Sequence, residues 1–147
     1  MKKLILIRHA KSSWKYNVSD LERPLSKRGF NDAKLMSIIL NNFSFKIDAV
    51  FSSNAKRTKQ TANIFLKNLT NHKKLFIVES TDLYDFSGEN VDLYVKNLKN
   101  DLDTVLVFSH NNSCNNLISK YSGIVNKHVP TCGILIFEFD VSLWSEV

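Results

Sequence analysis

Short apolar runs recur along the chain, separated by longer stretches in which apolar and polar residues are mixed. The apolar runs are rich in β-branched and aromatic residues, which is typical of buried strands. They predict strands at residues 4–7, 49–52, 75–78, 104–108 and 134–139. The stretches between them carry apolar residues at helical spacing, which predicts helices at residues 31–40, 55–69, 93–98 and 115–121.

Strands that alternate with helices favour a mostly parallel sheet covered on both faces. We therefore predict an α/β fold, a three-layer α/β/α sandwich. The 147 residues are close to the usual size of one domain, and no internal repeat or Gly/Pro-rich linker divides them. The prediction is one domain over residues 1–147.

The composition adds little to the prediction of the fold, but it indicates where in the cell the protein is expected. Hydrophobic residues make up 44% and charged residues 23%, as in soluble globular proteins. The apolar runs are too short to span a membrane, and Arg8 and Lys11 interrupt the first one too early for a signal peptide. We expect a cytoplasmic protein, monomeric or weakly dimeric, without a membrane partner. Cys114 and Cys132 match neither metal-ligand spacing nor a disulfide framework and are expected to be free thiols.

The formal net charge of +6 favours an anionic partner. The lysines are scattered, and no dense basic run is interleaved with aromatic residues, so the pattern indicates no nucleic acid. A phosphorylated protein or small phosphorylated substrate is the expected partner. His72 and His128 lie in polar segments and are expected to face solvent.

Unusual polar residues follow three of the predicted strands. The first strand leads into Arg8 and His9, the second into a helix whose first turn holds Arg57, and the fourth into His110. Ligands bind beyond the carboxyl ends of parallel strands, so these four side chains are predicted to meet at one rim. A cation such as Arg57 opposes the helix dipole unless an anion lies beside the free amides. Taken singly, each residue also fits a polar loop or a core histidine; together they predict an anion pocket.

Such a pocket suits phosphoryl transfer. A guanidinium group binds two phosphate oxygens in a bidentate manner and stays charged at any working pH. Arg8 and Arg57 are therefore the predicted phosphate ligands. A neutral His9 is the predicted nucleophile and forms a phosphohistidine intermediate. His110, protonated against the anion, is predicted to stabilise its charge. This chemistry requires no metal and no cofactor.

Five segments in this order resemble the histidine phosphatase, or phosphoglycerate mutase-like, superfamily, and within it the small phosphohistidine phosphatases. The segments are residues 6–14, 23–29, 52–62, 109–111 and 129–133. The resemblance implies a phosphoglycerate mutase-like fold, hydrolysis without a cofactor, and the roles given above for the four side chains. It also implies that Arg23 borders the phosphate pocket.

The sequence departs from the family pattern at several positions. Ala10 stands where a glycine is common, and Ser109 and Asn112 stand where a glycine and a proline commonly flank the second histidine. Many relatives carry a glutamate general acid after the third strand. The corresponding residue here is Asp85, with Glu89 as an alternative. A weak acid matters less for a phosphoramidate than for an alkyl ester, which favours a phosphohistidine substrate.

Other functions stay open at this stage. The run from Asp101 to Val105 imitates the motif of magnesium-dependent aspartate phosphatases, but it precedes a strand instead of following one. A phosphatase of small phosphate esters, of the phosphosugar type, and a non-catalytic phosphate-binding module are the remaining alternatives. We predict a metal-independent phosphatase that acts on protein phosphohistidine.

Overall fold

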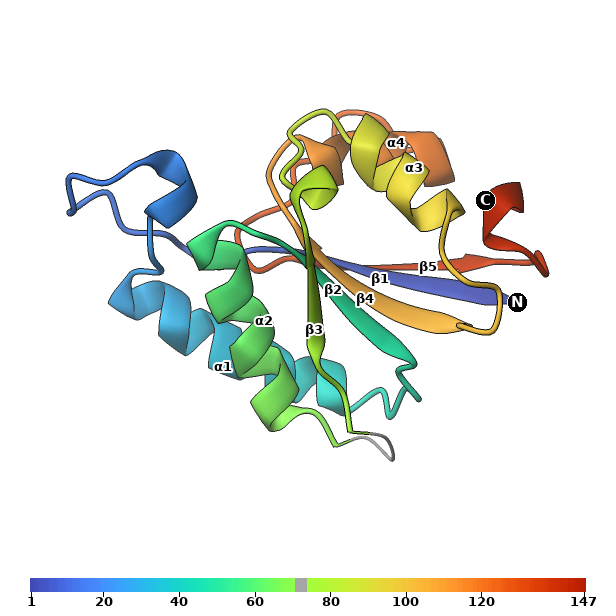
Figure 1. Cartoon of the computed structure of the whole chain (residues 1–147), viewed down its shortest axis with the longest axis horizontal. Coiled ribbons are helices and arrows are strands. Elements are labelled where there is room, and N and C mark those ends of the chain that lie inside the picture. Colours follow the sequence, from blue (N-terminus) through green and yellow to red (C-terminus); the bar gives the residue numbers. More distant parts are fainter. Residues whose placement is uncertain (71–73) are drawn as a thin grey trace.

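A five-stranded sheet forms the centre of the molecule (Figure 1). The computed structural model describes residues 1–70 and 74–147, so His72 lies outside the described residues. The strand order is β3-β2-β4-β1-β5; β5 runs antiparallel to β1, and the other pairs are parallel. The strands are β1 (Lys2–Arg8), β2 (Ala49–Ser53), β3 (Ile77–Ser80), β4 (Thr104–Ser109) and β5 (Ile134–Phe139).

Two pairs of helices cover the two faces of the sheet (Figure 1). Ile5 and Ile7 pack with residues of the two helices that follow β1 and β2, whereas Leu4 and Leu6 pack with residues of the two helices that follow β3 and β4. This alternation along β1 follows from the two-residue period of a strand and places one core on each face. The helices are α1 (Lys27–Asn41), α2 (Lys56–Asn68), α3 (Glu89–Lys96) and α4 (Ser113–Ser122), with three short 3₁₀ helices η1 (Asp20–Glu22), η2 (Thr81–Leu83) and η3 (Trp144–Glu146).

Hydrogen bonds connect the start of α1 to the segment that follows β1. The Ser26 side chain caps the helix by accepting from the Gly29 N–H at 3.1 Å. The N–H and hydroxyl of Ser26 donate to the Lys11 carbonyl at 2.9 and 3.0 Å. A Cβ on Gly29 would lie 2.1 Å from that carbonyl oxygen, so only glycine fits this close approach.

The three-layer α/β fold predicted from the sequence is confirmed, while several element boundaries differ. The third strand is Ile77–Ser80 instead of 75–78, because its pairing with β2 begins at Ile77. Helices α1 and α3 begin four residues before their predicted starts at 31 and 93, because each first turn holds a single large apolar side chain, Phe30 or Val91, which shows no helical period. Apolar periodicity carries no information about such turns.

Two further sequence expectations concern membranes and thiols. Among the helices in residues 1–70 and 74–147, none is long and apolar enough to cross a membrane. Cys114 and Cys132 are free and buried. Burial raises the pKa of both thiols to about 12.

Candidate functional site

The ends of β1, β2 and β4 bring the predicted cationic and imidazole side chains together. Arg8 ends β1 and pairs in register with Ser109, which ends β4, so His9 and His110 occupy equivalent positions directly after adjacent strands. Their ring centroids are 5.3 Å apart. Arg57 lies in the first turn of α2, which follows β2. The topology alone therefore explains why residues so far apart in sequence meet at one edge.

His9 is nearly buried, with 6% of its surface exposed, and its hydrogen bonds define its tautomer. Nδ1 lies 2.7 Å from the Ala10 carbonyl oxygen, which only accepts, so Nδ1 carries the proton. The lone pair of Nε2 then accepts from Arg57 Nε at 3.2 Å. Burial, opposed by the bond to Ala10 and reinforced by nearby arginine charges, lowers the pKa of His9 to about 3. The ring is therefore neutral near pH 7, with Nε2 available as a nucleophile.

His110 is fully buried and has the opposite tautomer. Arg57 Nη2 lies 3.3 Å from Nδ1, which must accept, so Nε2 donates to the Ser53 hydroxyl at 2.7 Å. Burial, reinforced by the nearby charge of Arg57, lowers the pKa of His110 to about 2. His110 is thus neutral in this structure, and its protonation against a bound anion stays a prediction.

Asp20, which the sequence analysis did not identify, connects the arginines. Arg57 is 1% exposed and donates from Nη1 to the Asp20 carbonyl at 2.6 Å and from Nη2 to Asp20 Oδ2 at 3.0 Å. Arg23 donates from Nη2 to Asp20 Oδ1 at 2.8 Å and from Nη1 to the Ser12 hydroxyl. Although burial raises it, hydrogen bonds from Tyr84, Arg23 and Arg57 hold the pKa of Asp20 well below its usual range.

These side chains surround a small polar cavity of about 310 Å³. Four of the lining residues are cations, against the single carboxylate of Asp20. The Nε atoms of Arg8 and Arg23 are buried without a hydrogen-bond partner, and unsatisfied buried donors are rare in folded proteins. A small anion with several acceptor oxygens would satisfy them. The cavity is lined by Arg8, His9, Lys11, Ser12, Trp14, Asp20, Arg23, Arg57, Phe86, Asn111 and Thr131.

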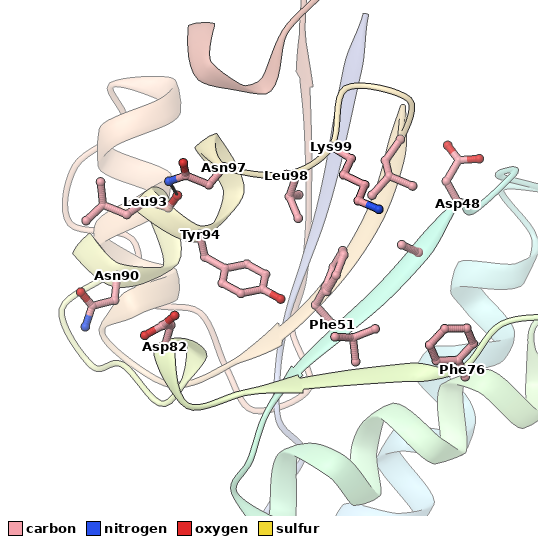
Figure 2. A pocket seen from close by; sticks show the side chains of 13 residues that line it. Asp48, Phe51, Phe76, Asp82, Asn90, Leu93, Tyr94, Asn97, Leu98 and Lys99 are labelled. Atoms are coloured by element: carbon pink, nitrogen blue, oxygen red, sulfur yellow. Dashed lines mark hydrogen bonds between the residues drawn. The ribbon is translucent and has the colours of Figure 1, made fainter.

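A larger hollow of about 900 Å³ lies between α3 and the strands β2 and β3 (Figure 2). Its walls are mostly apolar, with Phe51 and Tyr94 in edge-to-face contact 5.5 Å apart. The charged groups on its rim are the carboxylates of Asp48 and Asp82 and the ammonium of Lys99. Because it lacks arginine and histidine and carries more negative than positive charge, this hollow is unsuited to a phosphate.

The structure does not bring Asp85 into the small cavity. Its carboxylate is 6% exposed and accepts five hydrogen bonds, from the N–H and hydroxyl of Ser87 and from the N–H groups of Gly88, Asn90 and Val91. Although burial raises it, these bonds hold the pKa of Asp85 below its usual range. Asp85 thus stabilises the start of α3, and Glu89 lies exposed in the first turn of that helix.

The departures from the family pattern fit the local backbone. Ala10 is fully buried, its N–H donates to Thr61 Oγ1 at 3.0 Å, and its φ is not positive, so a glycine is unnecessary there. Asn112 has φ +61° at the start of α4, a conformation that the proline ring forbids. The start of α4 therefore follows a backbone path that a proline at this position does not allow.

Some residues of the cavity carry no signal in the sequence that would have identified them. Asp20 begins η1 and Arg23 directly follows it, three residues further on, a spacing that also occurs in ordinary surface ion pairs. Trp14 stacks on the Arg23 guanidinium at 3.8 Å, and Phe86 lies 5.0 Å from the His110 ring. Such contacts depend on loop conformation, which hydrophobic periodicity does not predict.

Comparison with known proteins agrees with this geometry. An uncharacterized chloroplastic protein of Arabidopsis thaliana is 27% identical over an alignment of 154 residues, which covers 99% of this chain and 70% of that protein. A protein of Agrobacterium tumefaciens provisionally assigned as the phosphohistidine phosphatase SixA shares the fold, with a TM-score of 0.82, 21% identity and coverage of 95% and 92% of the two chains. The protein histidine phosphatase SixA, solved with tungstate, has a TM-score of 0.79, 24% identity and coverage of 94% and 88%.

The match to a family is more specific than these likenesses of fold. The sequence matches the histidine phosphatase superfamily (branch 1) over residues 4–92, which is more than half of the chain. The matched segment contains Arg8, His9, Asp20, Arg23 and Arg57. The chain therefore belongs to the histidine phosphatase superfamily.

Proposed function

We propose that this protein is a metal-independent phosphatase that releases phosphate from protein phosphohistidine through a phosphorylated His9. One observation carries the proposal: a neutral His9 with an unprotonated Nε2 lines a cavity of about 310 Å³ in which four cations face one carboxylate. Membership of the superfamily supports phosphatase chemistry on a phosphorylated substrate. The substrate class and the roles of single residues belong to the proposal.

In the first step His9 Nε2 attacks phosphorus. The Nε2–P bond forms while the bond between phosphorus and the leaving nitrogen breaks, and its electron pair goes to the leaving imidazole. Arg8, Arg23 and Arg57 stabilise the negative charge on the phosphoryl oxygens, which also provide acceptors for the unpartnered Nε atoms of Arg8 and Arg23. The Ala10 carbonyl keeps the Nδ1 proton and so offsets the positive charge that develops on the ring.

In the second step water attacks the phosphorylated His9. The electron pair of the Nε2–P bond returns to His9, which becomes neutral again, and both protons of the water remain on the product phosphate. His110 lies 5.3 Å from the His9 ring and adds a polar wall to the same cavity. Neither step draws on Asp85, whose carboxylate is occupied by the start of α3.

A protein substrate agrees with the open mouth of the cavity. Trp14 and Phe86 line it and are 77% and 46% exposed, and exposed aromatic side chains are common anchors for peptide segments. A phosphoramidate substrate agrees with the lack of a protonated carboxyl group among the described lining residues, because a protonated imidazole leaves without help from an acid. Tungstate, bound in the SixA structure, is a tetrahedral oxyanion like phosphate.

The test measures phosphate release from a phosphohistidine peptide in the presence of EDTA. We expect turnover by the wild type and a rate at least about 10³-fold lower for His9→Ala. His128→Ala, which changes an exposed histidine outside the cavity, is the matched control and should behave as the wild type. Rapid quench of the wild type should trap an acid-labile, base-stable phosphoenzyme.

Other outcomes distinguish the alternatives. Full activity of His9→Ala would contradict the proposed nucleophile. If the wild type releases phosphate only from small phosphate esters, the protein is a phosphatase of the phosphosugar type. If it binds phosphopeptides without turning over any of them, it is a binding module.

A further inference from the structure

Asp20 is the one carboxylate among the described residues that line the small cavity. It is held there by Arg23, by Arg57 and by the Tyr84 hydroxyl, which donates to Oδ2. Its side chain is nevertheless 43% exposed, so part of it faces the mouth of the cavity. The carboxylate is therefore fixed in position but still accessible to a bound molecule.

A carboxylate is an unexpected neighbour for a phosphate. Like charges at such short range repel each other even at the effective dielectric constant of a protein surface. The Asp20 carboxylate also occupies one Nη atom of Arg57 and one of Arg23 that a phosphoryl group could use, while the other Nη atom of Arg57 donates to the Asp20 backbone carbonyl. A cavity that only had to bind phosphate would gain from losing this negative charge, whereas a substrate that also carries a positive charge would gain from its presence.

Phosphohistidine supplies such a charge. When its ring is protonated, the nitrogen distant from phosphorus carries an N–H and the ring is positive. In-line attack by His9 places this ring opposite Nε2, toward the mouth of the cavity. As the P–N bond breaks, its electron pair neutralises the ring, which leaves as imidazole and keeps its N–H. No proton is taken from the enzyme, and Asp20 remains a carboxylate throughout.

We infer that Asp20 determines substrate specificity by accepting a hydrogen bond from the N–H of the leaving imidazole, and so selects phosphohistidine over phosphate esters. The inference rests on the proposed function and deepens it. The arrangement would match that of His9 itself, whose Nδ1–H is held by the Ala10 carbonyl at 2.7 Å while Nε2 takes the phosphoryl group. An ester has no such N–H, and its alkoxide needs a proton that Asp20 does not hold.

The experiment compares Asp20→Asn with the wild type on three probes: a phosphohistidine peptide, p-nitrophenyl phosphate and inorganic phosphate. We expect kcat/KM for the peptide to fall roughly ten- to hundredfold, as for loss of a hydrogen bond to a charged group. Turnover of p-nitrophenyl phosphate, whose leaving group has no N–H and needs no acid, should be unchanged or higher. Inorganic phosphate should bind at least as tightly, because a negative charge is removed.

Two further variants control the comparison. Asp20→Glu should recover part of the peptide activity, since it restores the carboxylate. Glu22→Gln removes an exposed carboxylate from the same 3₁₀ helix and should leave all three readings unchanged. If peptide turnover, ester turnover and phosphate binding all fall together in Asp20→Asn, Asp20 only positions Arg57 and the inference is overturned. Unchanged peptide turnover would overturn it as well.

Failure of the proposed function gives a different result. In that case the wild type does not release phosphate from the phosphohistidine peptide at all, whatever residue stands at position 20, and both proposals are rejected together.

Discussion

Asp20 and Asp85 both lie near the carboxyl edge of the sheet, in the loops that follow β1 and β3, but their partners differ. Asp85 accepts all five of its hydrogen bonds from Ser87 to Val91, within six residues of its own position. Asp20 accepts from Arg23 nearby and from Arg57 and Tyr84, which are far away in the sequence. Local backbone donors make a carboxylate part of the fold, whereas cationic side chains from several segments make it part of a site.

Asp85→Ala tests the contrast between Asp85 and Asp20, and it is expected to have the largest effect on stability. The substitution leaves several N–H groups of the loop and of α3 without an acceptor, so the free energy of unfolding should fall by about 2–4 kcal/mol. Urea denaturation measures this change. Because the carboxylate does not line the cavity, kcat/KM per folded molecule should stay within about threefold of the wild type.

Glu89→Gln is the matched control, since it changes an exposed carboxylate in the first turn of the same helix. It should alter neither stability nor activity. Asp85→Ala with normal stability but little activity would reverse the assignment and make Asp85 a member of the site.

Gly29→Ala should have a smaller effect, on the loop that carries Asp20. The new Cβ would lie 2.1 Å from the Lys11 carbonyl, so α1 and the segment after His9 must separate. We expect a loss of about 1–3 kcal/mol, as for overpacking, together with weaker phosphate binding, because Lys11 and Ser12 line the cavity. Urea denaturation and phosphate titration by calorimetry measure the two effects.

Gly123→Ala is the control for backbone strain alone. Gly123 has φ +72°, but nothing lies within 4 Å of a Cβ placed there, so only a cost of about 1 kcal/mol is expected, with normal phosphate binding. Equal effects of the two substitutions on phosphate binding would contradict the proposed link between α1 and the cavity.

The layers of the fold could be predicted from the sequence. So could the close approach of four side chains at one edge of the sheet, those of Arg8, His9, Arg57 and His110. Each of these four ends a strand, directly follows one or lies in the first turn of the next helix, so a parallel sheet determines where they lie. The sequence was insufficient for Asp20, whose position depends on how the loop between β1 and α1 folds back onto α2.

Asp85 shows the converse problem. Its place after the third strand suggested a proton donor by resemblance, yet the residues that follow it, Ser87 and Gly88, let the backbone turn around its carboxylate. Gly88 has φ +90° in this turn, a conformation that glycine adopts without strain. A sequence motif specifies the residue type here, while hydrogen bonding determines what the residue does.

The smallest effect is expected for Tyr84→Phe, which tests the link between the loops that follow β1 and β3. Tyr84 donates a hydrogen bond to Asp20 and directly precedes Asp85. Tyr84→Phe removes the hydroxyl that donates to Asp20 Oδ2 but keeps the ring, which packs 5.2 Å from His110 and 5.1 Å from Phe86. The free energy of unfolding should therefore change by about 1 kcal/mol or less. With one anchor lost, Asp20 should be less well placed, and kcat/KM for a phosphohistidine peptide should fall by about two- to fivefold.

A double-mutant cycle decides whether this effect passes through Asp20. In an Asp20→Asn background, adding Tyr84→Phe should cause almost no further loss of peptide turnover, because the carboxylate that Tyr84 positions is already gone. Independent, multiplicative effects would instead mean that the Tyr84 hydroxyl acts on the substrate directly. The cavity would then have a second polar group facing the leaving group, and Asp20 would share the selection of substrate with it.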